Sequence, residues 1–533
     1  MYEKIKFSNI RGLYLYLNYC FKLFLNFLRV RKDFWFINFK KVNENKEEKR
    51  ILLFSPSLNL DKPSYITVGI KALINTAKYR GIGVDYIQCI NALTICHLGG
   101  SPFSTNNSMP CSSCKSVNKR IFNDVNIVKL EKNNINEKND FNKLNINELR
   151  NFKYKGYKLG ELVTSSIIWI KRSAEIKDKD APYYIKMIQD GIELVDYFET
   201  IDLSIYSGVL VFNGASFPES ILFETCKKRD INVATFEGGL SYKNKYCIEF
   251  NYGITAQHNF NFNEKKDSSI TNPDEHNLDN LMTKQWVDGV DVKEGYFSDL
   301  YEIDTEDKKV ISIFGNVSWD TSQYISNSTF DSMFAWLDSL TKVLDEYPNH
   351  KFIFRAHPGE NRNLKKTYYG LGEWFEENIK EKYDNAICIV ANNKTDSYKI
   401  INSSDLVLVY NSTIGMESAM LGKKTYVAAN THYSDQPFVN YYDTKKAYLK
   451  NLIKDIKNDD FKLEDNLINL SKNYYFQLFN FVSYSLDDLI IKTTDKYIEV
   501  DSEKIDEKDY LINSQFNNLL DRFLNKENIQ FLN

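Results

Sequence analysis

Two segments of this 533-residue chain end an apolar run on side chains that can bind an anion. The first, residues 352–362, reads FIFRAHPGENR, and its His357 is one of only six histidines in the chain. His357 can donate to a phosphate oxygen, and a nearby anion would keep it charged because its ordinary pKa lies near neutrality. Arg355 offers a second phosphate contact, although an arginine at a strand end is as often a surface ion pair.

The residues behind His357 fit the same interpretation. Pro358 fixes the backbone that follows the imidazole. Glu360 either orients a neighbouring side chain or opens the next helix, where a carboxylate is favoured in any case. Residues 355–360 are therefore a predicted anion-binding turn.

The second segment, residues 406–430, reads LVLVYNSTIGMESAMLGKKTYVAAN. Its Asn-Ser-Thr at 411–413 can cap a helix that starts directly behind, and the exposed N–H groups at a helix start attract phosphate. Gly415 permits close approach of the backbone, and Glu417, one turn into the helix, can accept hydrogen bonds from a ribose. The alternative is that the same three residues only cap an ordinary turn.

Strands and helices that position these turns can be predicted from the apolar runs. Strands are expected at residues 50–56, 83–89, 208–214, 231–239, 309–316, 351–358, 385–390, 405–410 and 424–429, and helices at 218–230 and 328–348. Strands that are nearly all apolar and alternate with helices predict a parallel sheet covered on both faces. Ligands bind at the carboxyl ends of such strands, so we expect both turns to face one cleft.

This pattern predicts an α/β fold with two doubly wound Rossmann-like domains facing a cleft, and with helical extensions at both ends. The length of the chain also favours two or three domains. The predicted segments are 1–47 for an apolar helix and lead-in, 48–262 for the N-terminal domain with a polar insertion, 263–307 for a linker, 308–440 for the C-terminal domain and 441–533 for a helical region.

Charge and cysteine content narrow the class of protein. A net charge of −3 without a long basic run disfavours nucleic acid as a partner. Cys96, His97, Cys111 and Cys114 lie close in sequence, and either a zinc site or a loop of free thiols fits them. The D-x-D at residues 178–180 lies in a charged segment and is interpreted as incidental.

Residues 11–31 form an apolar stretch with one narrow polar stripe, because Asn18, Lys22 and Asn26 recur every four residues. Those three side chains would be costly inside a bilayer, which argues against a spanning helix. Either the helix lies in a membrane surface or it packs on the protein. We expect a cytoplasmic protein with peripheral contact to the inner face of the membrane as an option.

Several motifs in order resemble one family. GNVSWD, FAWLDSL, FIFRAHPGENR and VLVYNSTIGMESAMLGKKTYVAANTHY, with VFNG, FEGG and GYKLGELVTSS in the first half, are similar to bacterial capsular polysaccharide biosynthesis proteins related to the capsule Kdo transferases. The resemblance spans roughly residues 50 to 450. It implies a metal-independent GT-B glycosyltransferase without a cofactor, which transfers a sugar from a nucleotide donor, such as CMP-Kdo, to a lipid-linked or glycan acceptor.

The same resemblance implies that the C-terminal domain holds the donor. The predicted donor-binding residues are Arg355, His357, Pro358, Glu360, Asn411, Ser412, Thr413, Gly415 and Glu417. Residues predicted to line the cleft are Asn213, Gly238, Asn316, His432 and Tyr433.

Transfer to an acceptor hydroxyl also needs a base, and two carboxylates are candidates. Glu237 ends a strand of the first half and is followed by two glycines that would let a substrate approach. Asp320 occupies a similar place in the second half. We favour Glu237, while the structural alternatives are that Glu237 closes a turn and that Asp320 caps the helix behind it.

Three other functions remain open from the sequence. A teichoic-acid-type polyol-phosphate transferase also uses two such domains and a His-Pro element. A nucleotide-sugar epimerase would need no acceptor, and a non-catalytic polysaccharide export or binding protein would keep only the fold. Hydrolase, P-loop and dinucleotide-binding motifs are absent from the sequence.

Overall fold

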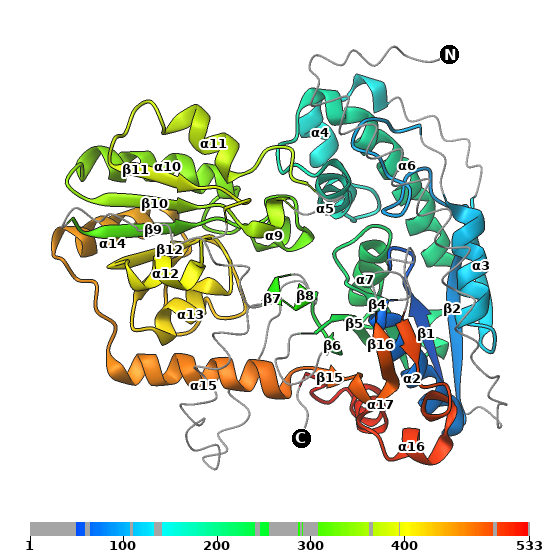
Figure 1. The fold of residues 1–533 in the computed structure, drawn as a ribbon. Helices are drawn as coiled ribbons and strands as arrows, with labels where there is room; N and C mark the ends of the chain where they lie inside the picture. The colour runs from blue at the N-terminus through cyan, green and yellow to red at the C-terminus, as the bar shows by residue number, and fades with distance from the viewer. Residues whose placement is uncertain are drawn as a thin grey trace.

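A computed structural model describes residues 49–58, 64–106, 110–132, 141–239, 246–254, 286–287, 290–291, 308–361, 366–393, 395–493 and 498–530. The predicted helix within residues 11–31 lies outside this part of the chain. So does the predicted linker at 263–307, apart from the two short strands β7 (Trp286–Val287) and β8 (Val290–Asp291). Figure 1 shows two lobes side by side, each built around a sheet.

The N-terminal lobe contains a seven-stranded sheet in the order β15-β6-β5-β4-β1-β2-β3. Its strands are β1 (Lys49–Phe54), β2 (Ile82–Ile90), β3 (Asn126–Glu131), β4 (Gly208–Phe212), β5 (Val233–Gly238), β6 (Cys247–Asn251) and β15 (Tyr484–Ser485). The first five are parallel, and β6 and β15 add two antiparallel pairings at one edge. The helices are α2 (Tyr65–Tyr79), α3 (Cys111–Ile121), α4 (Ile146–Arg150), α5 (Leu159–Lys171), α6 (Ala181–Thr200) and α7 (Glu219–Lys228).

The C-terminal lobe contains a six-stranded, wholly parallel sheet in the order β11-β10-β9-β12-β13-β14. Its strands are β9 (Val310–Phe314), β10 (Lys351–Arg355), β11 (Ala386–Ile389), β12 (Leu406–Val409), β13 (Lys424–Val427) and β14 (Asn440–Tyr441). Its helices are α9 (Thr321–Ser326), α10 (Met333–Glu346), α11 (Leu371–Asn378), α12 (Ser397–Asn402), α13 (Ile414–Met420) and α14 (Lys445–Lys457). In chain order this is the 3-2-1-4-5-6 arrangement of a doubly wound sheet, so the predicted fold class is confirmed.

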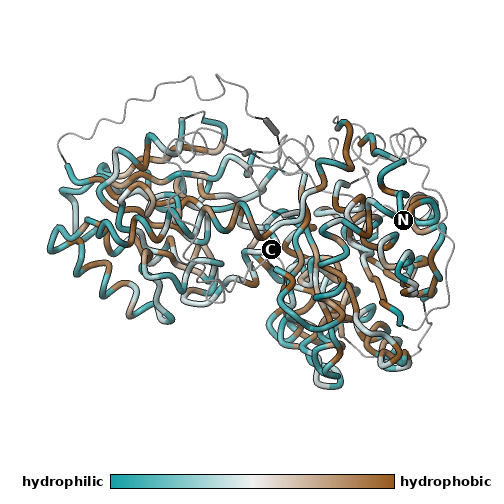
Figure 2. Tube along the Cα trace, turned by 90° about the horizontal axis from the view of Figure 1, so that it is seen from below, coloured by the Kyte–Doolittle hydropathy of each residue, from teal (hydrophilic) through white to brown (hydrophobic). Residues whose placement is uncertain are grey.

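Alternation along each central strand divides the core into two layers. In β1, Ile51 and Leu53 pack on one face of the sheet while Leu52 and Phe54 pack on the other. Strand β9 alternates in the same way. Ile311 and Ile313 pack on one face of the second sheet, and Val310 and Phe314 pack on the other. Figure 2 shows the apolar segments gathered inside each lobe. Near-continuous apolar strands are what a sheet covered on both faces requires.

The chain after the second sheet is divided between the lobes. Helix α15 (Asp465–Phe481) packs on the C-terminal lobe through buried residues such as Leu478, and then runs back toward the first sheet (Figure 1). There β15 pairs with β6, and α16 (Lys508–Ile512) and α17 (Gln515–Asn525) pack on α2. A small hairpin of β16 (Ile490–Thr493) and β17 (Ile498–Val500) lies between them in sequence. The last ninety residues therefore join the two lobes a second time.

Candidate functional site

The strand order of the C-terminal sheet reverses between β9 and β12, and an amide side chain follows each of these strands. Asn316 Nδ2 donates to Asn411 Oδ1 at 2.9 Å, and Gln323 Nε2 of α9 donates to the same oxygen at 2.8 Å. Asn411 Nδ2 makes no hydrogen bond to any described residue. A crevice at such a reversal is where doubly wound sheets bind ligands. The structure thus brings two predicted site residues together.

His357 follows β10, which is the neighbour of β9 on the other side. The Gly359 N–H donates to His357 Nδ1 at 3.0 Å, so the imidazole proton lies on Nε2. Burial, with a further contribution from the Arg355 charge, lowers the pKa of His357 to about 4, although the Asp320 carboxylate opposes the shift. The predicted charge on His357 depends on a bound anion and stays a prediction. With only protein groups around it, the side chain is a neutral N–H donor at neutral pH.

Arg355 has a different role from the predicted one. Its side chain is only 2% exposed, and its guanidinium donates to the carbonyls of Val390 at 2.9 Å, Thr395 at 3.2 Å and Asn393 at 3.3 Å. Desolvation lowers the pKa of Arg355 to about 10, which leaves it charged. The predicted phosphate contact of Arg355 is wrong, because the guanidinium is engaged in holding the loop behind β11.

Glu360 and Glu417 have carboxyl groups that are engaged by other residues of the protein. Glu360 Oε1 accepts from the N–H of Leu371 at 3.3 Å, at the start of α11, and burial raises the pKa of Glu360 to about 8. Glu417 Oε2 accepts from the Tyr398 hydroxyl at 3.0 Å, and burial raises the pKa of Glu417 to about 7. Glu417 is half-buried on α13, the helix behind the Asn411 turn. Its contact with a ribose stays a prediction.

The turn of residues 411–413 is half-buried and lies directly before α13. Ser412 Oγ lies 3.5 Å from the Ile414 nitrogen, and Thr413 makes no capping bond with its side chain. A Cβ at Gly415 would lie 2.5 Å from the Tyr433 hydroxyl oxygen and 2.8 Å from Val409 Cγ2. The space at Gly415 is therefore filled by the protein itself, and the prediction of a close ligand approach there is wrong.

His432 and Tyr433 do not line a cleft. They are 6% and 0% exposed, respectively. The His432 ring stacks on Tyr474 of α15, and the Tyr433 hydroxyl donates to the carbonyl of Ser412. The prediction that both residues line the cleft is therefore wrong. They pack inside the protein, because α15 covers this edge of the lobe. Tyr433 still supports the backbone of the Ser412 turn.

In the N-terminal lobe, Glu237 and Asn213 form a pair at the ends of β5 and β4. Asn213 Nδ2 donates to Glu237 Oε2 at 2.5 Å, and Asn213 Oδ1 accepts from the N–H groups of Ala215 and Ser216. A Cβ at Gly238 would lie 2.3 Å from the Tyr65 hydroxyl oxygen. The prediction that Gly238 admits a substrate is therefore wrong, since Tyr65 occupies the space.

Asp320 is the N-cap of α9. Its carboxylate accepts from the Ser322 N–H at 3.0 Å and from the Ser322 hydroxyl at 2.9 Å. This arrangement matches the structural alternative for Asp320. Its charge also acts on His357, which places the start of α9 beside the His357 turn.

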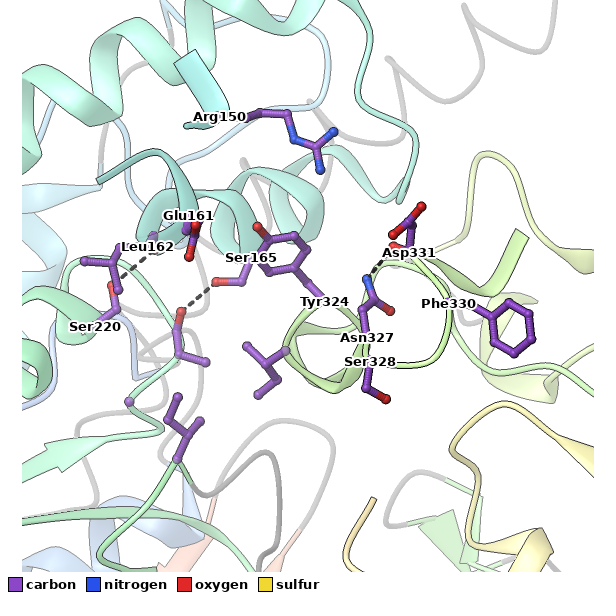
Figure 3. Close-up of a pocket in the computed structure, with 14 residues that line it drawn as sticks. Arg150, Glu161, Leu162, Ser165, Ser220, Tyr324, Asn327, Ser328, Phe330 and Asp331 are labelled. Carbon is purple, nitrogen blue, oxygen red and sulfur yellow. Dashed lines mark hydrogen bonds between the residues drawn. The ribbon is translucent and has the colours of Figure 1, made fainter. Parts of the chain in front are cut away.

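A cavity of about 640 Å³ lies between the lobes (Figure 3). The N-terminal lobe contributes residues of α4, α5 and the segment behind β4, and the C-terminal lobe contributes α9 and the segment that follows it. Its polar lining includes Arg150, Glu161, Ser165, Tyr324, Asn327 and Asp331.

None of the predicted site residues lines this cavity, but two of its lining residues adjoin them. Gly214, which lines it, directly follows Asn213. Asn327 lines the opposite side and accepts a hydrogen bond from Tyr410, the residue before Asn411. Sequence reasoning missed its charged residues, because α5 and α9 meet only in the folded chain. The one available signal was Glu161 in the GYKLGELVTSS motif.

The described residues include all four members of the cysteine-histidine group. In the part of the chain that the structure describes, no set of three or more His, Cys, Asp or Glu side chains is arranged to hold a metal ion. His97 Nε2 lies 2.7 Å from Ser166 Oγ, and its ring stacks on Trp169. Burial raises the pKa of the Cys96 and Cys114 thiols to about 12, so both are protonated.

In the described part of the chain, no helix has the length and apolarity to cross a bilayer.

Comparison with known proteins gives weak but consistent likenesses. No family model matches the chain, and no curated protein sequence matches it. Among solved structures, it resembles the KpsC beta Kdo 2,7 transferase of Thermosulfurimonas dismutans with 16% identity and a TM-score of 0.30, over 61% of this chain and 89% of that one. The beta Kdo 2,4 transferase of the same organism gives 13% identity and a TM-score of 0.35, over 58% and 88%.

The UDP-GlcNAc 2-epimerase of Neisseria meningitidis, bound to UDP-GlcNAc, gives 13% identity and a TM-score of 0.23, over 80% of this chain and 99% of that one.

Proposed function

We propose that this protein is a glycosyltransferase whose C-terminal lobe binds a nucleotide-activated sugar and whose N-terminal lobe presents the acceptor. The observation that carries the proposal is the Asn316–Asn411 pair at the reversal of strand order, flanked by His357 on one side and the Ser412 turn on the other. Neighbouring strands lie about 5 Å apart, so the ends of β10 and β12 are about 10 Å apart across β9. A nucleotide phosphate and its sugar can span that distance.

The chemistry of this edge suits a phosphate leaving group. His357 Nε2–H and Asn411 Nδ2 are neutral donors, and the N–H groups of the Ser412 turn add a third source of positive potential. Donors held in place before the reaction stabilise the negative charge that develops as the sugar–phosphate bond breaks. In the proposed reaction this stabilisation comes from the protein, without a cofactor.

In this proposal the cavity between the lobes holds the acceptor. Its two lining carboxylates are Glu161 from α5 and Asp331 from the segment behind α9. Glu161 belongs to the N-terminal lobe and its side chain is 45% exposed, with Lys158 at 3.2 Å. We assign Glu161 as the base that takes the proton of the acceptor hydroxyl, with Glu237 as the second candidate because Asn213 engages it.

The finer assignment rests on the motif resemblance. On that basis we propose a role in capsular or surface polysaccharide biosynthesis, with a donor of the CMP-Kdo kind and a lipid-linked or glycan acceptor. The corresponding place of action is the cytoplasmic side of the membrane.

The proposal is tested by incubating the purified chain with CMP-, UDP- and GDP-sugars and measuring nucleotide release with and without lipid-linked glycan. We expect release from one donor class, increased by acceptor and lost in Asn411→Ala. Asn458→Ala is a matched control, because Asn458 is an exposed residue at the end of α14. Interconversion of the free sugar nucleotide without acceptor would identify an epimerase instead. With a CDP-polyol added to the panel, transfer of the polyol phosphate to the acceptor and release of CMP would identify the teichoic-acid-type reaction.

A further inference from the structure

Arg172 lies where the two lobes touch. It directly follows α5 and has a left-handed backbone, with φ of 54°. Its guanidinium carbon lies 3.8 Å from the ring centre of Trp169 in α5 and 4.3 Å from that of Trp319, which belongs to the loop behind β9. A planar guanidinium stacks favourably on an aromatic face, so Arg172 joins one tryptophan of each lobe.

The rings of Trp169 and Trp319 meet edge to face, with centroids 6.4 Å apart, and other contacts fix each of them. In the N-terminal lobe, the His97 ring stacks on Trp169 with centroids 4.7 Å apart. In the C-terminal lobe, Trp319 is buried and its Nε1 donates to Thr367 Oγ1 at 2.8 Å. The backbone of Arg172 takes part as well, because its carbonyl accepts from the Tyr368 N–H at 3.1 Å. The junction therefore has side-chain and main-chain components.

The loops held by Arg172 are the ones that carry the proposed donor site. Trp319 stands three residues after Asn316 and directly before Asp320. Thr367 and Tyr368 belong to the segment that follows His357, and the Thr367 N–H donates to the Glu360 carbonyl at 2.8 Å. A displacement of Arg172 would thus be transmitted to both sides of β9.

We infer that Arg172 is a positioning residue, which couples the contact between the lobes to the binding of the donor nucleotide. The inference rests on the proposed function. Arg172 itself contacts neither substrate in this assignment. Its part is to hold the Trp319 loop, and with it Asn316, in the arrangement that binds the donor.

The test compares Arg172→Ala, Arg172→Lys and the wild-type chain in calorimetric titrations with CMP, UDP and GDP. We expect Arg172→Ala to weaken binding of the preferred nucleotide about 5- to 10-fold, and Arg172→Lys to recover only part of this, because an ammonium stacks less well than a guanidinium. Small-angle scattering of the same samples should show more separated lobes in Arg172→Ala. Arg229→Ala is the control, since Arg229 is exposed and its guanidinium donates to the Ile201 carbonyl at 3.2 Å, away from Trp169 and Trp319.

The outcomes separate the two proposals. Unchanged nucleotide affinity in a folded Arg172→Ala protein would overturn the coupling and leave the transferase proposal intact. Absence of any nucleotide binding by the wild-type chain would overturn both. If Arg172→Ala does not fold, Arg172→Lys decides the matter, with weaker binding supporting the coupling and wild-type binding contradicting it.

Discussion

The two sheets share the order of their first five strands, yet their carboxyl ends differ at the point where that order reverses. In the N-terminal lobe this point is filled by Glu219, whose side chain is 0% exposed and accepts from the Ser57 N–H at 2.5 Å. In the C-terminal lobe it holds the half-buried amides of Asn316 and Asn411. One edge is closed by the Glu219 carboxyl group, and the other presents the Asn411 amide, which we propose binds the donor.

The difference shows that topology offers a binding position but side-chain chemistry decides whether it is used. The N-terminal lobe contributes to the site from its flank instead, through α5 and the segment behind β4 that line the cavity. We therefore expect substitutions at the two reversal points to have opposite consequences, for stability in one lobe and for ligand binding in the other.

Glu161→Gln should have the largest effect. Loss of a general base lowers the transfer rate about 10²- to 10⁴-fold, while donor affinity should remain unchanged because Glu161 lies in the other lobe. Steady-state nucleotide release with acceptor present measures the rate, and Glu224→Gln on α7 is the control. A larger loss in Glu237→Gln would move the base to the Asn213–Glu237 pair.

Asn411→Ala and Asn213→Ala sharpen the contrast between the lobes. Removing Asn411 leaves the amides of Asn316 and Gln323 without their acceptor, so donor affinity should fall about 5- to 100-fold. Asn213 has a left-handed backbone with φ of 58°, and its replacement by alanine should lower the free energy of unfolding by about 1–3 kcal/mol with donor affinity unchanged. Calorimetry and urea denaturation measure the two quantities. Equal changes in donor affinity and in the free energy of unfolding in the two variants would contradict the distinction between the two sheet edges.

His357→Ala tests the protonation state of the donor edge. A pKa of about 4 leaves the imidazole neutral from pH 6 to 8, so its contribution to nucleotide affinity, about 5- to 10-fold, should be equal at both pH values. The affinity ratio of wild type to His357→Ala is the quantity to measure, because the titration of the phosphate cancels in it. A ratio that disappears between pH 6 and 8 would show that the charged form binds.

Glu219→Gln should leave nucleotide affinity unchanged and affect only the pH dependence of stability. Burial raises the pKa of Glu219 to about 8 from its ordinary value of 4.5, so the folded state binds a proton that the unfolded state releases. Stability from this group is full below pH 4.5 and is lost as the pH rises to 8. Urea denaturation between pH 5.5 and 8.5 should show a smaller decline in Glu219→Gln than in wild type. An equal decline would mean that Glu219 does not hold that proton.

The sequence predicted the sheets where apolar runs were long and well bounded. The strands that became β9, β10 and β12 are almost wholly apolar, and each was located to within a few residues. The two-residue strand β15 could not be predicted, because it joins β6 from more than two hundred residues away and has no pattern of its own. Polar edges of a sheet leave little trace in local composition.

Site residues could be predicted where they directly follow an apolar strand, and not where their role depends on contacts that are distant in the sequence. Asn316 and Asn411 could be proposed because they follow predicted strands, although their contact depends on a strand order that the sequence does not display. Arg355 was misassigned because the carbonyls that engage it belong to a loop nearly forty residues further on. The contact of Arg172 with Trp319 was missed for the same reason, since it forms only when the lobes meet.

A crystal structure of the chain with the nucleotide that it releases would test the central claim most directly. We predict nucleotide at the carboxyl edge of the C-terminal sheet, with a phosphate oxygen within hydrogen-bond distance of His357 Nε2 and Asn411 Nδ2 in contact with the ligand. Nucleotide bound at the ends of β1 and β4 in the N-terminal lobe, or away from both residues, would contradict the account.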